Sequence, residues 1–188
     1  EDFFSKVILK VDSEYYELSH AQKRIWFIEQ FEKGTNAYHI PLIYEIGKES
    51  NVDALKYAIE RIVERHEILR STILYDNNLG CAIQKVENRI LKIEEETLAK
   101  KSDYKAIIKS EINCPFNLSN ELPIKVKFYR IESGSKSLEE KLILLIKIHH
   151  MASDGWSVNI FQKELKAYYD AFVRNDLEFS LSPLEIQY

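Results

Sequence analysis

An uninterrupted apolar run in the C-terminal part of the sequence constrains the fold more than any other feature. The aliphatic segment 142–146 is followed by Lys147 and Ile148, and then by His149 and His150. A continuous run of this kind, without alternating polar residues, is typical of a strand that is covered on both faces. The sequence therefore predicts a buried strand at the centre of a sheet, ending at a pair of histidines.

A helix is predicted directly after this strand. Apolar side chains recur there at steps of three and four residues, the spacing of one helical face, at Val158, Phe161, Leu165, Tyr168 and Phe172. Catalytic groups are typically carried on turns that rigid elements hold in place. The turn between strand and helix, which holds both histidines, an aspartate and a glycine, is therefore the candidate active site.

The rest of the chain predicts an α/β fold, an α+β sandwich in which helices pack on a mixed sheet. Helices are expected over residues 20–32, 52–70 and 103–113, and strands over 38–46, 71–75, 81–86, 90–94 and 124–129. Ser19 and Gln22 have the spacing of a capping box at the first helix. Pro41 predicts either that its strand lies at a sheet edge or that the ladder of hydrogen bonds is interrupted there, because proline has no amide hydrogen to donate.

Composition and charge argue against several classes of function. The formal net charge is -4 and the basic residues are scattered among acidic ones, so we expect no nucleic-acid partner. No apolar run approaches the roughly 20 residues that cross a bilayer, so we expect no membrane segment and a cytoplasmic protein. Cys81 and Cys114 lack metal-ligand spacing and are expected to be reduced thiols.

The paired histidines are candidates for chemistry rather than for a metal site. Neighbouring residues on a strand point to opposite faces, so His149 and His150 cannot easily serve one site. A zinc site needs several converging ligands, and no further Cys/His cluster in the sequence supplies them. We therefore expect no bound metal, with one histidine facing the reaction and the other facing the scaffold. The alternative is that both are hydrogen-bonded core residues.

Motifs at several places along the chain resemble those of a known family. The HHxxxDG pattern at residues 149–155 is the signature of the condensation domains of nonribosomal peptide synthetases, which belong to the chloramphenicol acetyltransferase-like superfamily. The pattern LSxAQxRxW at 18–26 resembles the first motif of that family, and RHExLR at 65–70 resembles its second. The DGWS variant at 154–157 is most similar to domains that accept an L-configured donor.

This resemblance implies a domain organisation. Such domains consist of two similar α/β lobes arranged in a V, with the histidine motif at the floor of a tunnel between them. Residues 15–188 are then expected to form the N-terminal lobe, with a lead-in segment at 1–14 and with the C-terminal lobe absent. We expect the lobe to be inactive on its own and to have that second lobe and neighbouring synthetase domains as partners.

The resemblance also implies a reaction. The α-amine of an acceptor aminoacyl thioester attacks a donor acyl thioester, and each substrate is held on the phosphopantetheine arm of a donor or an acceptor peptidyl carrier protein. The chain itself is expected to bind no cofactor. By resemblance His150 is the catalytic residue, either as a base or by positioning the amine, because an imidazole can accept a proton near neutral pH.

Other motif residues are expected to support the site. Asp154 is predicted to form a salt bridge with an arginine of the earlier motifs, to cap the following helix, or both. Arg65 is the preferred partner, with Arg24 and Arg70 as alternatives. Gly155 is expected to let a substrate approach the backbone closely.

Several residues beside these motifs are expected to serve the scaffold. His149 is interpreted as support, and His66 as a hydrogen-bonded histidine of the core or of the interface between lobes. Trp26, Phe27 and the apolar stripe of the last helix are interpreted as core.

Two other functions remain open from the sequence. The parent domain could be a non-catalytic platform that recruits carrier or tailoring proteins, or an acyltransferase of small molecules that uses coenzyme A with the same histidine. His150 and Asp154 are both present, which argues against the platform. The arginine-rich second motif and Trp26 favour the synthetase assignment over the coenzyme A enzyme.

Overall fold

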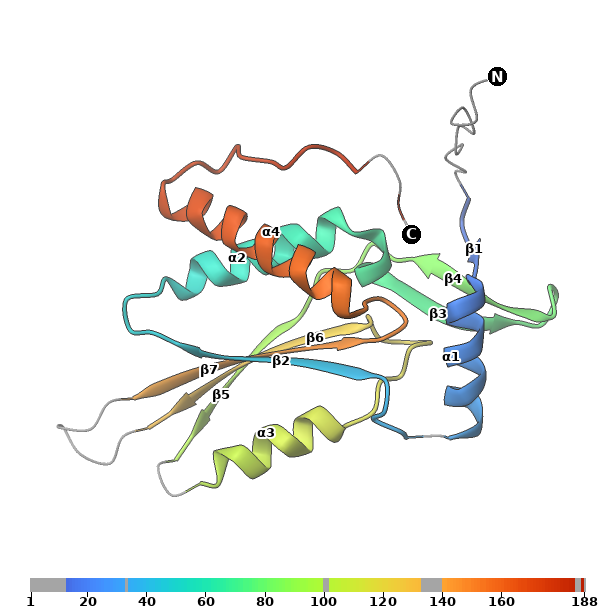
Figure 1. The fold of residues 1–188 in the computed structure, drawn as a ribbon, viewed down its shortest axis with the longest axis horizontal. Coiled ribbons are helices and arrows are strands. Elements are labelled where there is room, and N and C mark those ends of the chain that lie inside the picture. Colours follow the sequence, from blue (N-terminus) through green and yellow to red (C-terminus); the bar gives the residue numbers. More distant parts are fainter. Residues whose placement is uncertain (1–12, 33, 100–101, 133–139, 185–186, 188) are drawn as a thin grey trace.

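A computed structural model describes residues 13–32, 34–99, 102–132, 140–184 and 187 of the chain (Figure 1). Residues 1–12 of the expected lead-in segment lie outside the described residues. The elements in chain order are β1 Tyr16–Glu17, α1 His20–Phe31, β2 His39–Ile46, α2 Val52–Arg65, the 3-10 helix η1 Glu67–Arg70, β3 Ser71–Asp76, β4 Cys81–Val86, β5 Ile93–Leu98, α3 Tyr104–Asn113, β6 Ile124–Ile131, β7 Lys141–His149 and α4 Gly155–Val173.

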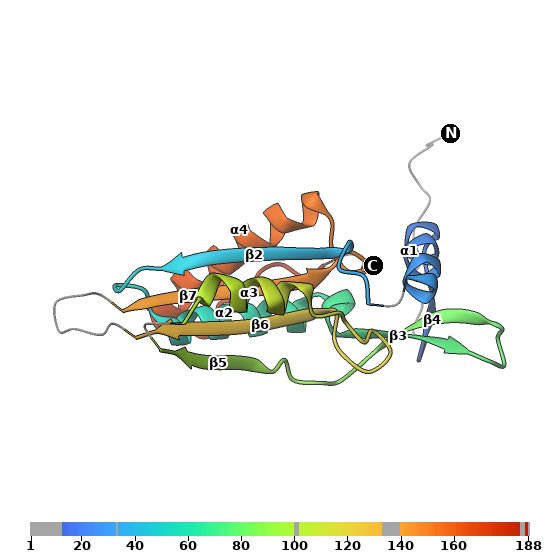
Figure 2. The same cartoon turned by 90° about the horizontal axis from the view of Figure 1, so that it is seen from below.

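The main sheet has four strands in the order β2, β7, β6, β5. β7 pairs antiparallel with β2 on one side and with β6 on the other, whereas β5 runs parallel to β6. α2 and α4 cover one face of this sheet and α3 covers the other (Figures 1 and 2). The predicted sandwich of helices on a mixed sheet is thus confirmed, with β7 as an inner strand.

Alternate residues of β7 belong to separate hydrophobic cores. Leu144, Ile146 and Ile148 pack with α2 and α4, while Ile143 and Leu145 pack with α3. After its first two residues the whole strand is buried, as the unbroken apolar run predicts. Burial of each large aliphatic side chain stabilises a fold by about 1.5–3 kcal/mol. β7 therefore gives rigid support to the turn that follows it.

A smaller antiparallel sheet in the order β1, β4, β3 lies beside α1, at the end of the main sheet where β7 stops (Figures 1 and 2). The hairpin between β3 and β4 turns at Gly80, whose φ of +66° is a left-handed conformation that glycine adopts without steric cost. Met151, in the turn after β7, is buried in one core with Leu18 and Ile73. The candidate active-site turn thus lies where the two sheets meet.

Most predicted elements are confirmed, including the local signals at α1 and β2. The hydroxyl of Ser19 accepts from the Gln22 amide, and the Ser19 amide donates to the Gln22 side chain, so the capping box is present. β2, which contains Pro41, is an edge strand as expected.

The structure corrects two element boundaries. The second helix ends at Arg65 rather than at residue 70, because His66 takes an extended backbone conformation and a 3-10 turn follows. The strand expected at 90–94 is displaced toward the C-terminus and lies at Ile93–Leu98, where it pairs with β6.

The prediction that Phe27 is a core residue is wrong. Its side chain is 62% exposed on α1 and contacts the exposed ring of Phe31 in a tilted arrangement, with ring centroids 4.5 Å apart. Trp26 is partly buried against the core that contains Met151. In the described part of the chain, no helix combines the length and the apolar character that crossing a membrane requires.

Candidate active site

The turn between β7 and α4 separates its two histidines into different environments. β7 ends at His149 and α4 begins at Gly155. His149 is fully buried, whereas His150 is exposed and its backbone amide donates to the Tyr38 carbonyl at 2.8 Å. The expectation that the two imidazoles serve different surroundings is therefore confirmed.

Both ring nitrogens of His149 form hydrogen bonds. Nδ1 accepts a hydrogen bond from the Met151 amide at 3.2 Å, so Nε2 carries the ring hydrogen and donates to Oε1 of Glu29 at 3.3 Å. Burial, with a smaller contribution from the charges of His39 and His150, lowers the pKa of His149 to about 3. Burial also raises the pKa of the Glu29 carboxyl. The ring of His149 is thus neutral and fixed in one tautomer.

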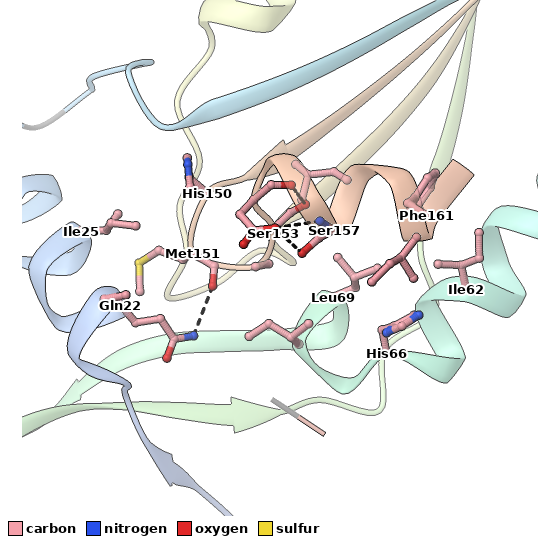
Figure 3. Close-up of a pocket in the computed structure, with 16 residues that line it drawn as sticks. Gln22, Ile25, Ile62, His66, Leu69, His150, Met151, Ser153, Ser157 and Phe161 are labelled. Carbon is pink, nitrogen blue, oxygen red and sulfur yellow. Dashed lines mark hydrogen bonds between the residues drawn. The ribbon is translucent and has the colours of Figure 1, made fainter. Parts of the chain in front are cut away.

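His150 is among the residues that line a cavity of about 330 Å³ (Figure 3). α1, α2, η1, the turn and α4 all contribute lining residues, most of them apolar, such as Ile62, Leu69 and Phe161. Pockets for small organic ligands typically have volumes of about 300–1,000 Å³ and a largely apolar lining with a few polar groups. Two imidazoles, those of His66 and His150, and the carboxylate of Asp154 are among the polar groups of this otherwise largely apolar lining.

Asp154 caps α4 and forms no ion pair with an arginine among the described residues. Its Oδ1 accepts from both the amide and the hydroxyl of Ser157, each at 2.7 Å, and these bonds lower the pKa of the Asp154 carboxyl. The predicted salt bridge is therefore wrong, and the N-cap role is confirmed. The physical reason is that an exposed carboxylate at a helix start already has donors and a favourable helix dipole.

Arg65, the preferred partner of Asp154, instead pairs with Glu164 of α4. Its Nε lies 3.0 Å from Oε1 of Glu164, and Nε2 of His66 lies 2.7 Å from the other carboxylate oxygen. Burial alone would raise the pKa of Glu164, but His66 and Arg65 outweigh it and lower this pKa. His66 is therefore a hydrogen-bonded histidine, as expected, and the motif ties α2 to α4.

The other two candidate arginines also lie apart from Asp154. Arg70 has Nη2 3.6 Å from Oε1 of Glu67, and Arg24 is exposed on α1. A Cβ added to Gly155 would meet no atom within 4 Å, so the space beside the start of α4 is open. Across the described residues, no group of three or more His, Cys, Asp or Glu side chains could hold a metal ion.

Sequence reasoning missed three residues that hold the site together. Glu29 and Glu164 were not singled out, and Gln22 was identified only as a helix cap and motif residue. A usable signal existed for Glu164, which follows Phe161 by three residues and precedes Tyr168 by four, and so lies on the apolar face of its helix. A carboxylate in that position requires a buried partner.

The fold and the site together define a chloramphenicol acetyltransferase-like α/β protein with a histidine turn of the HHxxxDG type. Solved structures with this fold include the starter condensation domain of rhizomide synthetase RzmA, with a TM-score of 0.70 and 17% identity over 93% of this chain and 40% of that chain. The X-domain from teicoplanin biosynthesis has a TM-score of 0.74 and 23% identity over 95% of this chain and 37% of that chain. At such identities the likeness establishes the fold.

The family is established by sequence. A profile of the condensation domain matches residues 12–185, and the chain belongs to the condensation domain family. The bassianolide nonribosomal cyclodepsipeptide synthetase of Beauveria bassiana is 35% identical over 174 residues, or 92% of this chain. The N-(5-amino-5-carboxypentanoyl)-L-cysteinyl-D-valine synthase of Penicillium chrysogenum is 30% identical over 182 residues, or 94% of this chain. In each case the chain spans 5% of the length of the relative.

Proposed function

We propose that residues 15–188 form the N-terminal lobe of a condensation domain that makes amide bonds between carrier-bound thioesters in nonribosomal peptide synthesis. The observation that carries this proposal is the difference in environment between the two histidines. His149 is buried and neutral, whereas His150 is exposed at the cavity. Membership of the condensation domain family and the synthetase relatives support the same substrate class.

The proposed reaction moves one proton from the attacking nitrogen to the departing sulfur. The acceptor α-amine attacks the carbonyl carbon of the donor thioester, a C–N bond forms, the C–S bond breaks, and the phosphopantetheine thiol leaves. The attacking nitrogen becomes cationic and must lose a proton, while the departing thiolate must gain one. His150 accepts the proton from the nitrogen, or holds the amine in line for attack. General-base help of this kind typically contributes about 10²- to 10⁴-fold.

The partners in this proposal are a donor and an acceptor peptidyl carrier protein, whose arms bring both substrates to the cavity. A C-terminal lobe covers the open side of the cavity and completes the tunnel, and neighbouring synthetase domains supply the carriers. The preference for an L-configured donor stays a prediction that rests on the DGWS sequence at 154–157.

The test is a product assay with the intact domain. Donor and acceptor carrier proteins are loaded with aminoacyl groups, and the acceptor carrier is analysed by mass spectrometry for the dipeptidyl thioester. A parallel reaction offers coenzyme A thioesters and free amines. The proposal predicts product on the acceptor carrier. Product from coenzyme A thioesters alone would support the small-molecule acyltransferase, and no product from either reaction would support a recruitment platform.

A further inference from the structure

The side chain of Gln22 joins α1 to the active-site turn and to the smaller sheet. Its Nε2 donates to the Met151 carbonyl at 3.2 Å (Figure 3). The same nitrogen donates to Oε1 of Gln84 at 3.1 Å. Its Oε1 accepts from the backbone amide of Ser19 at 2.9 Å. The residue is only 3% exposed. A buried amide with these bonds is held in a single orientation.

The direction of this amide is fixed by partners of unambiguous character. A backbone amide can only donate, so the atom facing Ser19 is the oxygen of Gln22. A backbone carbonyl can only accept, so the atom facing Met151 is the nitrogen. The two assignments agree, which excludes the flipped side chain. The Gln22 side chain thus connects the start of α1 to the turn, accepting a hydrogen bond at one end and donating one at the other.

The turn is held on both sides of His150. The His150 amide donates to the Tyr38 carbonyl at 2.8 Å, and the Met151 amide donates to Nδ1 of His149. The Met151 carbonyl is the next backbone group, and Gln22 holds it. The backbone from which the His150 side chain projects therefore has fixed anchors before and after it.

We propose that Gln22 is a positioning residue for His150, acting through the Met151 carbonyl. This inference rests on the proposed function, in which the imidazole of His150 must meet the attacking amine. A displacement of reacting groups by about 1 Å can cost about 100-fold in rate. Loss of the Gln22 anchor leaves the Met151 carbonyl unheld and the peptide group fixed only through the Ala152 amide, which donates to the His149 carbonyl at 2.9 Å, so the turn shifts and carries His150 with it.

The decisive variant is Gln22→Glu, which has nearly the same shape. Glutamate also serves in a capping box, so the bond from the Ser19 amide is retained. The bond to Met151 is lost, because the introduced carboxylate has no hydrogen to donate to the backbone carbonyl, whereas the side-chain amide of Gln84 can turn and donate to the carboxylate. Gln22→Met is a second variant that removes the donors without adding charge, and it keeps the test open if the first does not fold.

Ser19→Ala is the matched control. It removes the hydroxyl that accepts from the Gln22 amide but keeps the Ser19 backbone amide that orients the Gln22 side chain. α1 thereby loses part of its cap and the melting temperature falls. The bond from Gln22 to Met151 is left in place. This variant separates destabilisation of α1 from displacement of the turn.

The measurements are steady-state turnover of the intact domain with loaded carriers and the NMR signal of the His150 Cε1–H group. We expect the Gln22 variants to lose about 10- to 100-fold in kcat, with KM for the carriers unchanged and the His150 signal moved. Ser19→Ala keeps both kcat and the signal. Full turnover in both Gln22 variants, or an equal loss in Ser19→Ala, would overturn the proposal.

The NMR signal also separates this inference from the proposed function. It needs no catalysis, so it reports on the turn even if the wild-type domain makes no product. Absence of product from the wild type would contradict the proposed function. An unmoved His150 signal in a folded Gln22 variant would contradict the positioning role alone.

Discussion

Nδ1 of His149 accepts a hydrogen bond from the backbone amide of Met151 at 3.2 Å, and His150 is the residue between these two in the chain. One histidine of the pair thereby shapes the turn that presents the other to the cavity. The same ring donates to Glu29 of α1 through Nε2. The buried histidine therefore connects β7, the turn and α1, and the exposed one is left available for chemistry.

Replacing His149 should destabilise the fold measurably. His149→Phe keeps a ring of similar size but leaves the buried Met151 amide and the Glu29 carboxyl without their partner. An unsatisfied buried polar group costs about 1–3 kcal/mol, and we expect a loss of that order in the free energy of unfolding, measured by urea denaturation. His20→Ala, at an exposed histidine of α1, is the control. Equal stability of the two variants would show that the His149 bonds contribute nothing.

Protonation of His149 should make stability depend on pH. The pKa of its side chain is about 3 in the fold and 6.5 without perturbation, so the folded state binds fewer protons than the unfolded one. Stability is then complete above pH 6.5 and is lost as the pH falls toward 3, with a slope of up to about 1.4 kcal/mol per pH unit. His39, whose pKa burial also lowers, acts in the same direction.

Urea denaturation at about pH 7.5 and about pH 5 measures this dependence. Glu29, whose pKa burial raises, has the opposite effect on stability and partly offsets this dependence. His149→Phe should flatten the dependence by removing the largest contribution. An identical fall in stability in the variant and the wild type would contradict a neutral, buried His149.

Asp154 and Arg65 should act independently. Asp154→Ala removes a helix N-cap and should cost about 0.5–2 kcal/mol. Arg65→Ala removes a partner of Glu164 instead. In a double-mutant cycle, sites without shared partners add to within about 0.5 kcal/mol, and we expect that result for Arg65 with Asp154. The cycle of Arg65 with Glu164 should give a coupling free energy larger than about 0.5 kcal/mol. Coupling of Arg65 with Asp154, without coupling of Arg65 with Glu164, would support the salt bridge predicted from the sequence.

The sequence allows the architecture to be predicted because its strongest signals are local and periodic. The apolar run of β7 and the capping box of Ser19 and Gln22 predict a buried strand and the start of α1, and the structure confirms both. Helix caps act within one turn of chain, so their spacing can be read directly. β5 shows the limit, since the register with β6 decides where this strand begins.

Pairings between distant residues could not be predicted in the same way. The choice of Arg65 as partner for Asp154 followed from its charge and its place in a motif, and neither says which carboxylate lies closer in space. Glu164 lies about two and a half turns along α4, facing α2, and it therefore pairs with Arg65. Phe27 shows the converse, because the face of α1 that it occupies is left uncovered among the described residues.

The central claim is that the imidazole of His150 takes part in the reaction. The most direct measurement is the single-turnover rate of condensation by the intact domain with loaded donor and acceptor carriers, for the wild type, His150→Ala and the control His20→Ala. His150 is exposed, so its removal should leave the melting temperature unchanged. We predict that His150→Ala lowers the rate by about 10²- to 10⁴-fold while His20→Ala does not. An undiminished rate in a folded His150→Ala domain would contradict the proposed function.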